Sequence, residues 1–281
     1  MTPGQPSKTM LRTAILRAAH QLLDKPLILN DPIAVGLVPE SSERALLATL
    51  DNQHDQMALR SLFALRSRFT EDRLAEAAAR NVSQYVIVGA GLDTFAWRQP
   101  DYARNMKIFA VDHVATLAWT QVRFWERGLP KPANLTFVPV DLEDGRLGER
   151  LVEFGFDLDT PSFCSALGVM HYLDRQAVDA LLGFASSLKA GSEIVFSFAP
   201  PEDDLQGDDV RMAVDAAERV AAIGEPWKTR LRPRELVECL THFGFSDVFQ
   251  LTLELAQQRY FAGREDGLKL PGFEQIICAI V

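Results

Sequence analysis

The feature that most constrains this sequence is a series of short apolar runs separated by helical segments. Five runs of this kind lie at residues 85–88, 107–111, 135–140, 162–167 and 192–198. Segments with helical spacing lie between them, at residues 97–101, 114–127, 145–154 and 174–188. Continuous apolar runs that alternate with helices are typical of parallel strands buried on both faces of a sheet. The sequence therefore predicts an α/β fold from Gln84 onward.

The chain on either side of this pattern is organised differently. Before it we predict helices at residues 12–23, 32–37 (introduced by Asn30-Asp31-Pro32) and 43–50 (capped by Ser41 or Ser42). Residues 58–79 should form one long helix or a pair of helices. After it, the polar stretch 201–209 is a candidate lid or a solvated loop, and it leads to helices at 210–223 and 232–243. Two final runs, 246–253 and 275–281, have no strong helix between them, which predicts an antiparallel pair that closes the sheet.

We expect these parts to form one domain over residues 1–281. Residues 1–80 would be a helical N-terminal extension or cap. Residues 81–281 would form a Rossmann-like cofactor-binding core, with an insertion around 200–232 that shapes the substrate pocket.

Composition excludes several classes of function. The chain carries 29 Lys and Arg against 38 Asp and Glu, a formal charge of −9. It therefore lacks the general attraction to phosphate that supports nucleic-acid binding. The cysteines and histidines show no metal-ligand spacing, so we expect reduced thiols and no metal, with His20 and Asp24 as a pair on a helix surface. No segment has the pattern of a signal peptide or a membrane span, so we expect a cytoplasmic protein that binds no membrane. The sequence leaves the oligomeric state undetermined.

The clearest local motif is Gly89-Ala90-Gly91, which follows the first predicted strand. Glycine permits unusual backbone dihedral angles and lets a ligand approach the main chain. A dinucleotide fingerprint would place a third glycine where Thr94 stands. The motif therefore favours a cofactor without a pyrophosphate, such as S-adenosylmethionine. The alternative is a tight turn that binds no ligand.

Two aspartates end the next two predicted strands. Asp112 could accept hydrogen bonds from both ribose hydroxyls of an adenosine cofactor, or it could cap the helix that begins at Val114. Asp141 could accept from an adenine amino group while Leu142 packs on the ring, or it could be a turn residue only. Because ligands of open α/β sheets bind at the carboxyl ends of the strands, we expect Gly89, Asp112 and Asp141 to line one site.

These motifs belong to a resemblance that covers nearly the whole chain. The sequence resembles the leucine carboxyl methyltransferase family, in particular its bacterial branch of S-adenosylmethionine-dependent methyltransferases. The matching segments, in chain order, are 17–24, 30–34, 66–69, 88–94, 111–113, 137–141, 167–169, 172–173, 260–264 and 266–268. The most specific part is Gly89-Ala90-Gly91-Leu92-Asp93-Thr94 together with the preceding Arg66-Ser67-Arg68.

The resemblance implies a class I methyltransferase fold, with a seven-stranded sheet and N-terminal helices over S-adenosylmethionine. It implies that Arg66 pairs with the methionine carboxylate of this cofactor, which suits an arginine fork. Without the resemblance, Arg66 would be taken as a solvated charge on a helix. The other implied cofactor-binding residues are Gly89, Ala90 and Gly91 for the methionine end, Asp112 for the ribose, and Asp141 with Leu142 for the adenine. His113, which follows Asp112, is also expected to line the cofactor site.

Two positions depart from the family pattern. Many members carry Glu-Gly after the fourth strand, with the Glu near the cofactor's amino group, whereas this chain has Leu167-Gly168. We expect Leu167 to line the cofactor site while the contact to the amino group comes from the backbone or elsewhere. The second departure is His171, around which Thr-Met-Tyr or Thr-Pro-Tyr is more usual.

The acceptor determines whether a base is needed. A carboxylate is ionised at neutral pH and needs none, whereas a hydroxyl does. His171 is placed to be that base or to line the pocket beside Tyr172. Further candidates for the acceptor pocket are Trp227, Tyr260, Phe261 and Arg264, of which Arg264 could face an anionic substrate. The sequence therefore predicts O-methyl transfer to a carboxylate or hydroxyl of a small molecule or peptide terminus.

Two alternatives remain at this point. One is an NAD(P)-dependent oxidoreductase, against which the missing third glycine and the antiparallel C-terminal pair both count. The other is a non-catalytic protein that binds S-adenosylmethionine or S-adenosylhomocysteine, and Leu167 in place of a glutamate leaves room for it.

Overall fold

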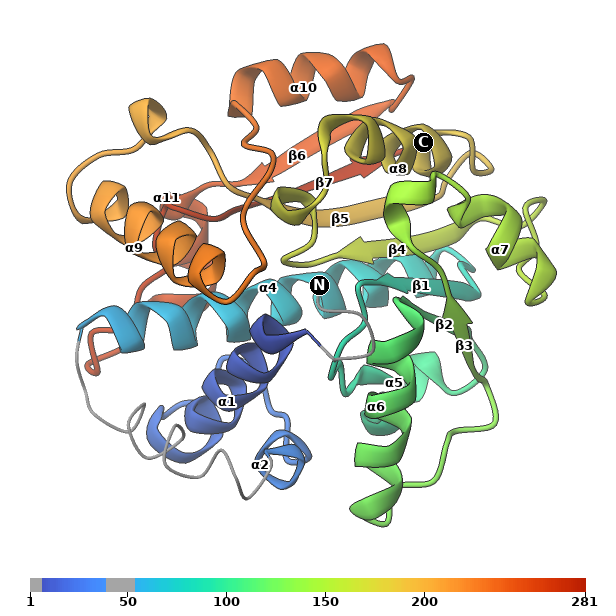
Figure 1. Cartoon of the computed structure of the whole chain (residues 1–281), viewed down its shortest axis with the longest axis horizontal. Coiled ribbons are helices and arrows are strands. Elements are labelled where there is room, and N and C mark those ends of the chain that lie inside the picture. The colour runs from blue at the N-terminus through green and yellow to red at the C-terminus, as the bar shows by residue number, and fades with distance from the viewer. Residues whose placement is uncertain (1–6, 39–53) are drawn as a thin grey trace.

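The computed structural model describes residues 7–38 and 54–281; the helix predicted at 43–50 and its serine caps lie outside these ranges. Seven strands form one sheet in the order β3-β2-β1-β4-β5-β7-β6 (Figure 1). The strands are β1 Gln84–Val88, β2 Lys107–Asp112, β3 Leu135–Pro139, β4 Ser162–Ala166, β5 Glu193–Phe198, β6 Asp247–Leu251 and β7 Gln275–Ile280. The α/β sheet predicted from the sequence is thus confirmed.

Strand direction also follows the prediction. The pairs β1–β2, β1–β4, β2–β3 and β4–β5 are parallel. Strand β7 is antiparallel to both β5 and β6, and it lies between them. Because β7 runs opposite to its neighbours, its amino end meets the carboxyl ends of the parallel strands at one edge of the sheet.

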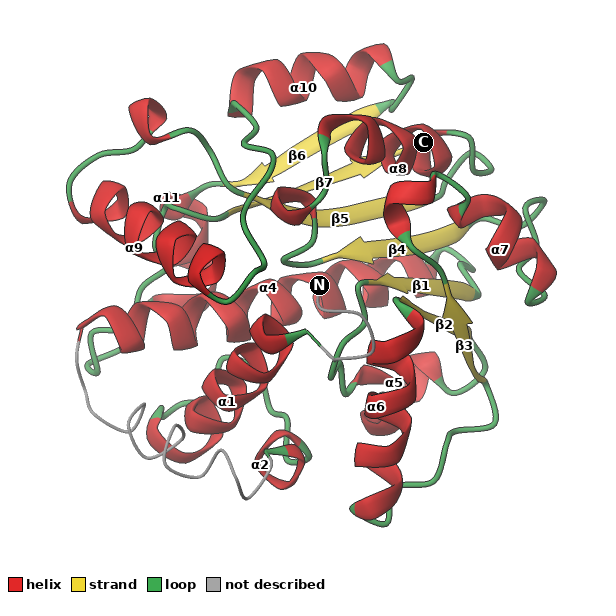
Figure 2. Cartoon of the chain, viewed as in Figure 1, coloured by secondary structure: helices red, strands yellow, loops and turns green. Residues whose placement is uncertain are grey.

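The helices are arranged around this sheet (Figure 2). They are α1 Lys8–Leu23, α2 Ala34–Leu37, α4 His54–Ala79, α5 Phe95–Arg98, α6 Val114–Glu126, α7 Leu147–Glu153, α8 Arg175–Ser186, α9 Asp208–Ala222, α10 Pro233–His242 and α11 Leu253–Ala256. Short 3-10 turns lie at Asp101–Ala103, Leu142–Asp144, Met170–Tyr172 and Glu202–Asp204, and a π-helical turn follows α11 at Gln257–Phe261. The segment between β6 and β7 thus contains one short helical stretch, which α11 and the π-helical turn form together over residues 253–261.

Local sequence explains where several helices begin. The Ser7 side chain accepts a hydrogen bond from the N–H of Met10 and caps α1. The Asp174 carboxylate accepts one from the N–H of Ala177 over 2.8 Å and caps α8. Proline at the first position starts α10, where its missing N–H is not needed.

Alternate side chains of the central strands serve two cores. Tyr85 and Ile87 of β1 pack in one core with residues of α4 such as Leu62. Val86 and Val88 point to the other face and pack with residues of α7, α8 and α10. All five residues of β1 are buried, which is why the run reads as continuously apolar rather than alternating.

The described ranges contain neither a helix that could span a membrane nor a cluster of metal ligands. No helix there combines the length and apolar character needed to cross a membrane. Within the same ranges, no three His, Cys, Asp or Glu residues are grouped in a way that could hold a metal ion.

Candidate functional site

A cavity of about 590 Å³ lies at the carboxyl ends of β1 to β4. Its walls also include residues of α1, α4, α9 and the segment before β7. This volume is in the range of small-molecule sites, and the place is where open α/β sheets bind ligands. All of the predicted cofactor-binding residues and both predicted catalytic residues line the cavity, namely Arg66, Gly89, Ala90, Gly91, Asp112, His113, Asp141, Leu142, Leu167, His171 and Tyr172. The structure therefore brings them together, and the cofactor contact of each stays a prediction.

The glycine loop after β1 lines the cavity and also packs against side chains of the protein. Gly89 and Gly91 have φ angles of 67° and 48°, a region that favours glycine. A Cβ on Gly89 would lie 2.4 Å from Cγ2 of Val169, and one on Gly91 would lie 2.9 Å from Cγ of Met10. Packing against these two side chains is thus by itself a reason for glycine at both positions.

Asp112 ties this loop to the end of β2. Its Oδ2 accepts a hydrogen bond from the N–H of Gly91 over 2.8 Å, and its Oδ1 accepts one from the N–H of His113 over 2.7 Å. Burial raises the pKa of the Asp112 carboxyl above its ordinary value, although these two N–H groups act in the opposite direction. The alternative role of Asp112 as helix cap is wrong, because His113 caps α6 through Nδ1, which accepts from the N–H of Ala115.

Asp141 has the turn role that was one of its two interpretations. Its Oδ1 accepts a hydrogen bond from the N–H of Glu143 over 3.0 Å and caps the 3-10 turn at Leu142–Asp144. The side chain is nevertheless exposed at the cavity wall, beside half-buried Leu142. Capping uses one carboxylate oxygen, so the other can still accept a hydrogen bond from a ligand.

Arg66 forms a buried ion pair that the sequence did not reveal. Its Nη1 lies 2.8 Å from Oε1 of Glu274, and the guanidinium lies 4.5 Å from the ring centroid of Phe63. Burial alone would raise the pKa of Glu274, but the nearby charge of Arg66 brings it below its ordinary value. The idea of Arg66 as a solvated helix charge is therefore wrong, since only 7% of the residue is exposed.

Glu274 lies close to the position where Leu167 lacks a carboxylate. A Cβ on Gly168, the residue after Leu167, would come within 2.8 Å of Nη1 of Arg66. The N–H of Gly168 donates to Oγ of Ser197 in β5 over 2.7 Å. Glu274 immediately precedes antiparallel β7, and through its pair with Arg66 its carboxylate lies close to the carboxyl end of β4.

His171 is a buried, neutral histidine in the same wall. Burial lowers its pKa to about 4, and its Nδ1 has no hydrogen-bond partner among the described residues. Its ring lies 4.6 Å from that of Tyr172 and 4.8 Å from that of Trp227, measured between centroids. Tyr172 is also a poor acid, because burial raises its pKa. Trp227, one of the predicted acceptor-pocket residues, lines the cavity.

Three other residues predicted for the acceptor pocket do not line this cavity. Arg264 forms an ion pair with Asp266 and donates to the carbonyl of Pro26, so it does not face a substrate here. Tyr260 donates to Asp72 over 2.9 Å, and Phe261 is buried in the core. Aromatic residues late in a chain are more often core than pocket, and only burial in the fold separates the two.

The polar stretch 201–209 also lies away from the cavity wall. Its 3-10 turn at Glu202–Asp204 is held by ion pairs with Arg230 and Arg232. None of the residues 201–209 lines the cavity. The interpretation as a solvated loop fits this arrangement better than that of a lid.

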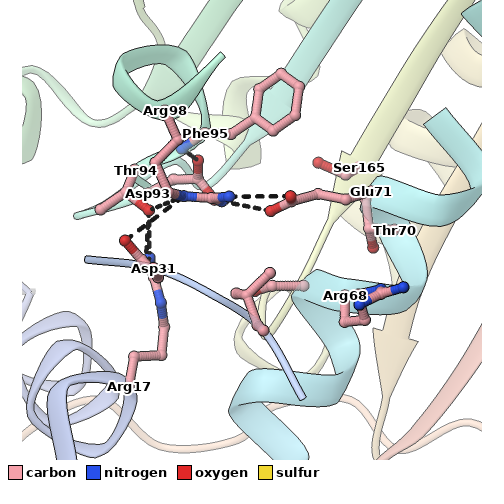
Figure 3. A network of polar contacts seen from close by, with 12 residues as sticks. Arg17, Asp31, Arg68, Thr70, Glu71, Asp93, Thr94, Phe95, Arg98 and Ser165 are labelled. Atoms are coloured by element: carbon pink, nitrogen blue, oxygen red, sulfur yellow. Dashed lines mark hydrogen bonds and ion pairs between the residues drawn. The ribbon is translucent and has the colours of Figure 1, made fainter. Parts of the chain in front are cut away.

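A buried polar network lies next to the segment that follows the glycine loop (Figure 3). Arg17 of α1 forms an ion pair with Asp31 and donates to Oγ1 of Thr94 over 2.7 Å. Arg98 of α5 donates to Thr94 over 3.0 Å and pairs with Glu71 of α4. Thr94, which stands where a dinucleotide fingerprint has its third glycine, is fully buried at the centre of this network. Asp31, predicted as a helix cap, is instead part of the same network.

His20 and Asp24 do not form the predicted surface pair. His20 is 0% and Asp24 4% exposed, with His20 Nδ1 2.8 Å from Asp24 Oδ2. Arg60 of α4 completes the cluster through an ion pair with Asp24. The prediction was wrong because α4 covers this face of α1, which spacing within α1 alone cannot show.

Glu225 fastens the beginning of α1 to the segment after α9. Its Oε1 accepts from the N–H of Lys8 over 2.8 Å. Its Oε2 accepts from Oγ of Ser7 over 3.0 Å and from Oγ1 of Thr9 over 2.7 Å. A carboxylate at a helix N-terminus is favoured by the free N–H groups and the helix dipole. Ser7, Thr9 and Glu225 all line the cavity, so this contact is part of its wall on the side of α1.

Comparison with known proteins places the chain in a family. Residues 10–186 match the family described as leucine carboxyl methyltransferase. The Bacillus subtilis (strain 168) protein named "Putative S-adenosyl-L-methionine-dependent methyltransferase YktD" is 29% identical over 299 residues, which cover 98% of this chain and 97% of that protein.

Two solved structures share the fold. A DUF574 family protein from Streptomyces avermitilis matches with a TM-score of 0.62 at 14% identity, over 96% of both chains. A "putative methyltransferase" from Thermobifida fusca matches with a TM-score of 0.59 at 17% identity, over 99% of this chain and 96% of the other. The fold and the family match over most of the chain agree, and the protein belongs to the leucine carboxyl methyltransferase family.

Proposed function

We propose that this protein is an S-adenosylmethionine-dependent O-methyltransferase whose acceptor oxygen belongs to a carboxylate of a small molecule or peptide terminus. The family supports the cofactor. The observation that carries the proposal is the cavity at the strand ends, where the Gly89–Gly91 loop, Asp112 and the Arg66–Glu274 pair share one wall. When bound, S-adenosylmethionine supplies a methyl group that its sulfonium charge has already activated.

The charges in this wall fit the cofactor's amino-acid end. An amino acid carries a carboxylate and an ammonium group close together. Arg66 and Glu274 present the complementary charges side by side, with 2.8 Å between their nearest polar atoms. Asp112 offers carboxylate oxygens for ribose hydroxyls, and its partner Gly91 keeps it in place. Asp141 and Leu142 would take the adenine.

The acceptor is a carboxylate because the cavity offers no strong base. Among the described residues of the wall, His171 is the candidate for a general base. With a pKa of about 4, it binds a proton too weakly to deprotonate a hydroxyl efficiently near pH 7. A carboxylate arrives ionised, so the protein only has to orient it and exclude water. Neutral His171 then serves as a hydrogen-bonding residue of the pocket.

A hydroxyl acceptor is the second candidate. The unpartnered Nδ1 of His171 is the observation that favours it, since a free ring nitrogen can accept a hydroxyl proton. Family membership counts against the oxidoreductase alternative. The non-catalytic alternative loses its main support, because Glu274 provides a carboxylate that Leu167 does not.

The test is methyl transfer from S-adenosylmethionine with a labelled methyl group to a panel of carboxylic acids and the matched alcohols. Methyl esters release labelled methanol at high pH, whereas methyl ethers do not. We expect base-labile label from acids only. Base-stable label from alcohols would move the acceptor to a hydroxyl. Tight binding of S-adenosylhomocysteine with no label in either panel would support a binding protein instead.

A further inference from the structure

The cavity wall contains two arginines without an acidic partner. Three basic residues of the wall are neutralised by ion pairs, namely Arg17 with Asp31, Arg66 with Glu274 and Lys228 with Glu143. Arg12 of α1 and Arg219 of α9 also line the cavity. Within residues 7–38 and 54–281, neither has a hydrogen bond or an ion pair.

The two arginines are held near each other by the contact between α1 and the segment after α9. Glu225, which accepts hydrogen bonds from Ser7, Lys8 and Thr9, fixes the first turn of α1. Arg12 lies one turn further along α1, and Arg219 lies in the last turn of α9. Within the described ranges, no hydrogen bond or ion pair joins Glu225 to Arg12 or Arg219.

The charges of Arg12 and Arg219 act unfavourably on each other. Arg12 is half-buried, and burial together with the like charge of Arg219 lowers the pKa of its guanidinium. Like charges disfavour each other's charged form, and an anion between them removes this penalty. Guanidinium groups also match the geometry of carboxylates and phosphates. This pair of arginines is therefore suited to an anionic ligand, although the net charge of the protein is −9.

We propose that Arg12 and Arg219 together bind an anionic group of the acceptor, a carboxylate or a phosphate, at the wall between α1 and α9. The inference rests on the proposed function, because it takes the acceptor to share the cavity with S-adenosylmethionine. It makes these two arginines specificity-determining residues, separate from the Arg66–Glu274 pair assigned to the cofactor.

The test is a calorimetric titration of the full chain, saturated with S-adenosylhomocysteine, with sodium benzoate and with sodium phosphate at constant ionic strength. Arg12→Met and Arg219→Met keep the apolar stem and remove the charge. The matched control is Arg104→Met, because Arg104 is exposed, paired with Asp101, and absent from the cavity wall. We expect the wild type to bind at least one of the anions and each cavity substitution to weaken its Kd about tenfold or more, as for loss of a charge-assisted hydrogen bond. We expect the control to bind as the wild type does.

The preferred anion identifies the group, benzoate standing for a carboxylate and phosphate for a phosphoryl group. Wild-type affinity in both cavity variants, or no binding of either anion to the loaded wild type, overturns the inference. The affinity for S-adenosylhomocysteine, measured first in every variant, separates the two proposals. If the wild type does not bind it, the proposed function fails; if it binds but the anion results are negative, only this inference fails.

Discussion

The substitution Glu274→Gln removes one charge from the pair with Arg66 while nearly keeping the size of the side chain. The paired atoms are 2.8 Å apart, and the two side chains are 8% and 4% exposed. At an effective dielectric constant of about 20, unit charges at this distance attract by about 6 kcal/mol before desolvation is subtracted. Removing one partner of a buried pair costs about 3–5 kcal/mol. Because glutamine can still accept a hydrogen bond from Arg66, we expect the unfolding free energy to fall by about 3 kcal/mol.

The same substitution tests the role given to Glu274 at the cofactor. A hydrogen bond between a carboxylate and an ammonium group contributes about 1.5–3 kcal/mol, or about tenfold to a hundredfold in Kd. S-adenosylhomocysteine carries the amino-acid end, whereas 5′-methylthioadenosine lacks it. Calorimetry with both ligands should therefore show that Glu274→Gln raises the Kd of S-adenosylhomocysteine at least about tenfold and leaves the Kd of methylthioadenosine unchanged.

Glu193→Gln is the matched control for general destabilisation. Glu193 is similarly buried and pairs with Arg73 over 2.6 Å and Arg80 over 2.8 Å. It is the first residue of β5 and therefore lies at the end of the strand that is far from the cavity. We expect this variant to lose stability in urea denaturation and to keep the wild-type ratio of the two Kd values. If Glu274→Gln leaves that ratio unchanged, or weakens both ligands equally, the reasoning about the amino-acid end is refuted.

Three further predictions concern other residues of the wall. Asp112→Asn should weaken S-adenosylhomocysteine and methylthioadenosine alike, by about tenfold or more in calorimetry, because both carry the ribose; an effect on only one would contradict the ribose role. Gly89→Ala should lower the midpoint of thermal unfolding, because its Cβ would lie 2.4 Å from Val169, and Val169→Ala in the same chain should restore part of the loss; a Gly89→Ala chain as stable as wild type would refute this. His171 has a pKa of about 4 when folded. Between about pH 6.5 and 4, His171 therefore binds a proton in the unfolded state but not in the folded state. The unfolding free energy of the wild type falls by up to about 3 kcal/mol as the pH falls through that window. The variant His171→Gln has no such titrating group, so the difference between its unfolding free energy and that of the wild type, measured by urea denaturation, should shrink from pH 7 to pH 4.5. A difference that stays constant with pH would contradict the buried neutral state of His171.

The sheet was predictable because its strands carry their own signal. Strands such as β1 are buried on both faces, so they appear as uninterrupted apolar runs that end at ligand-binding residues. The parallel strands also bring Gly89, Asp112 and Asp141 to one edge by topology alone. That is why motifs far apart in the sequence could be assigned to a single cavity before any contact was known.

The contributions of the C-terminal segment and of helix packing were not predictable in the same way. Glu274 follows no motif, and its place in the wall depends on β7 being antiparallel and next to β5. A usable signal exists in hindsight, since a residue just before a final antiparallel strand must lie at the ligand-binding edge. Arg264 and the pair of His20 with Asp24 depend on tertiary partners, Asp266 and Arg60, whose proximity no local periodicity encodes.

The most direct test of the central claim is a calorimetric titration of the wild-type chain with S-adenosylhomocysteine and, side by side, with NADH. A cavity built around Asp112 and the Arg66–Glu274 pair should bind one S-adenosylhomocysteine per chain and no NADH, and Arg66→Ala should weaken that binding while sparing methylthioadenosine. Binding of NADH that S-adenosylhomocysteine does not displace, or S-adenosylhomocysteine affinity that neither Arg66→Ala nor Asp112→Asn changes, would contradict the account.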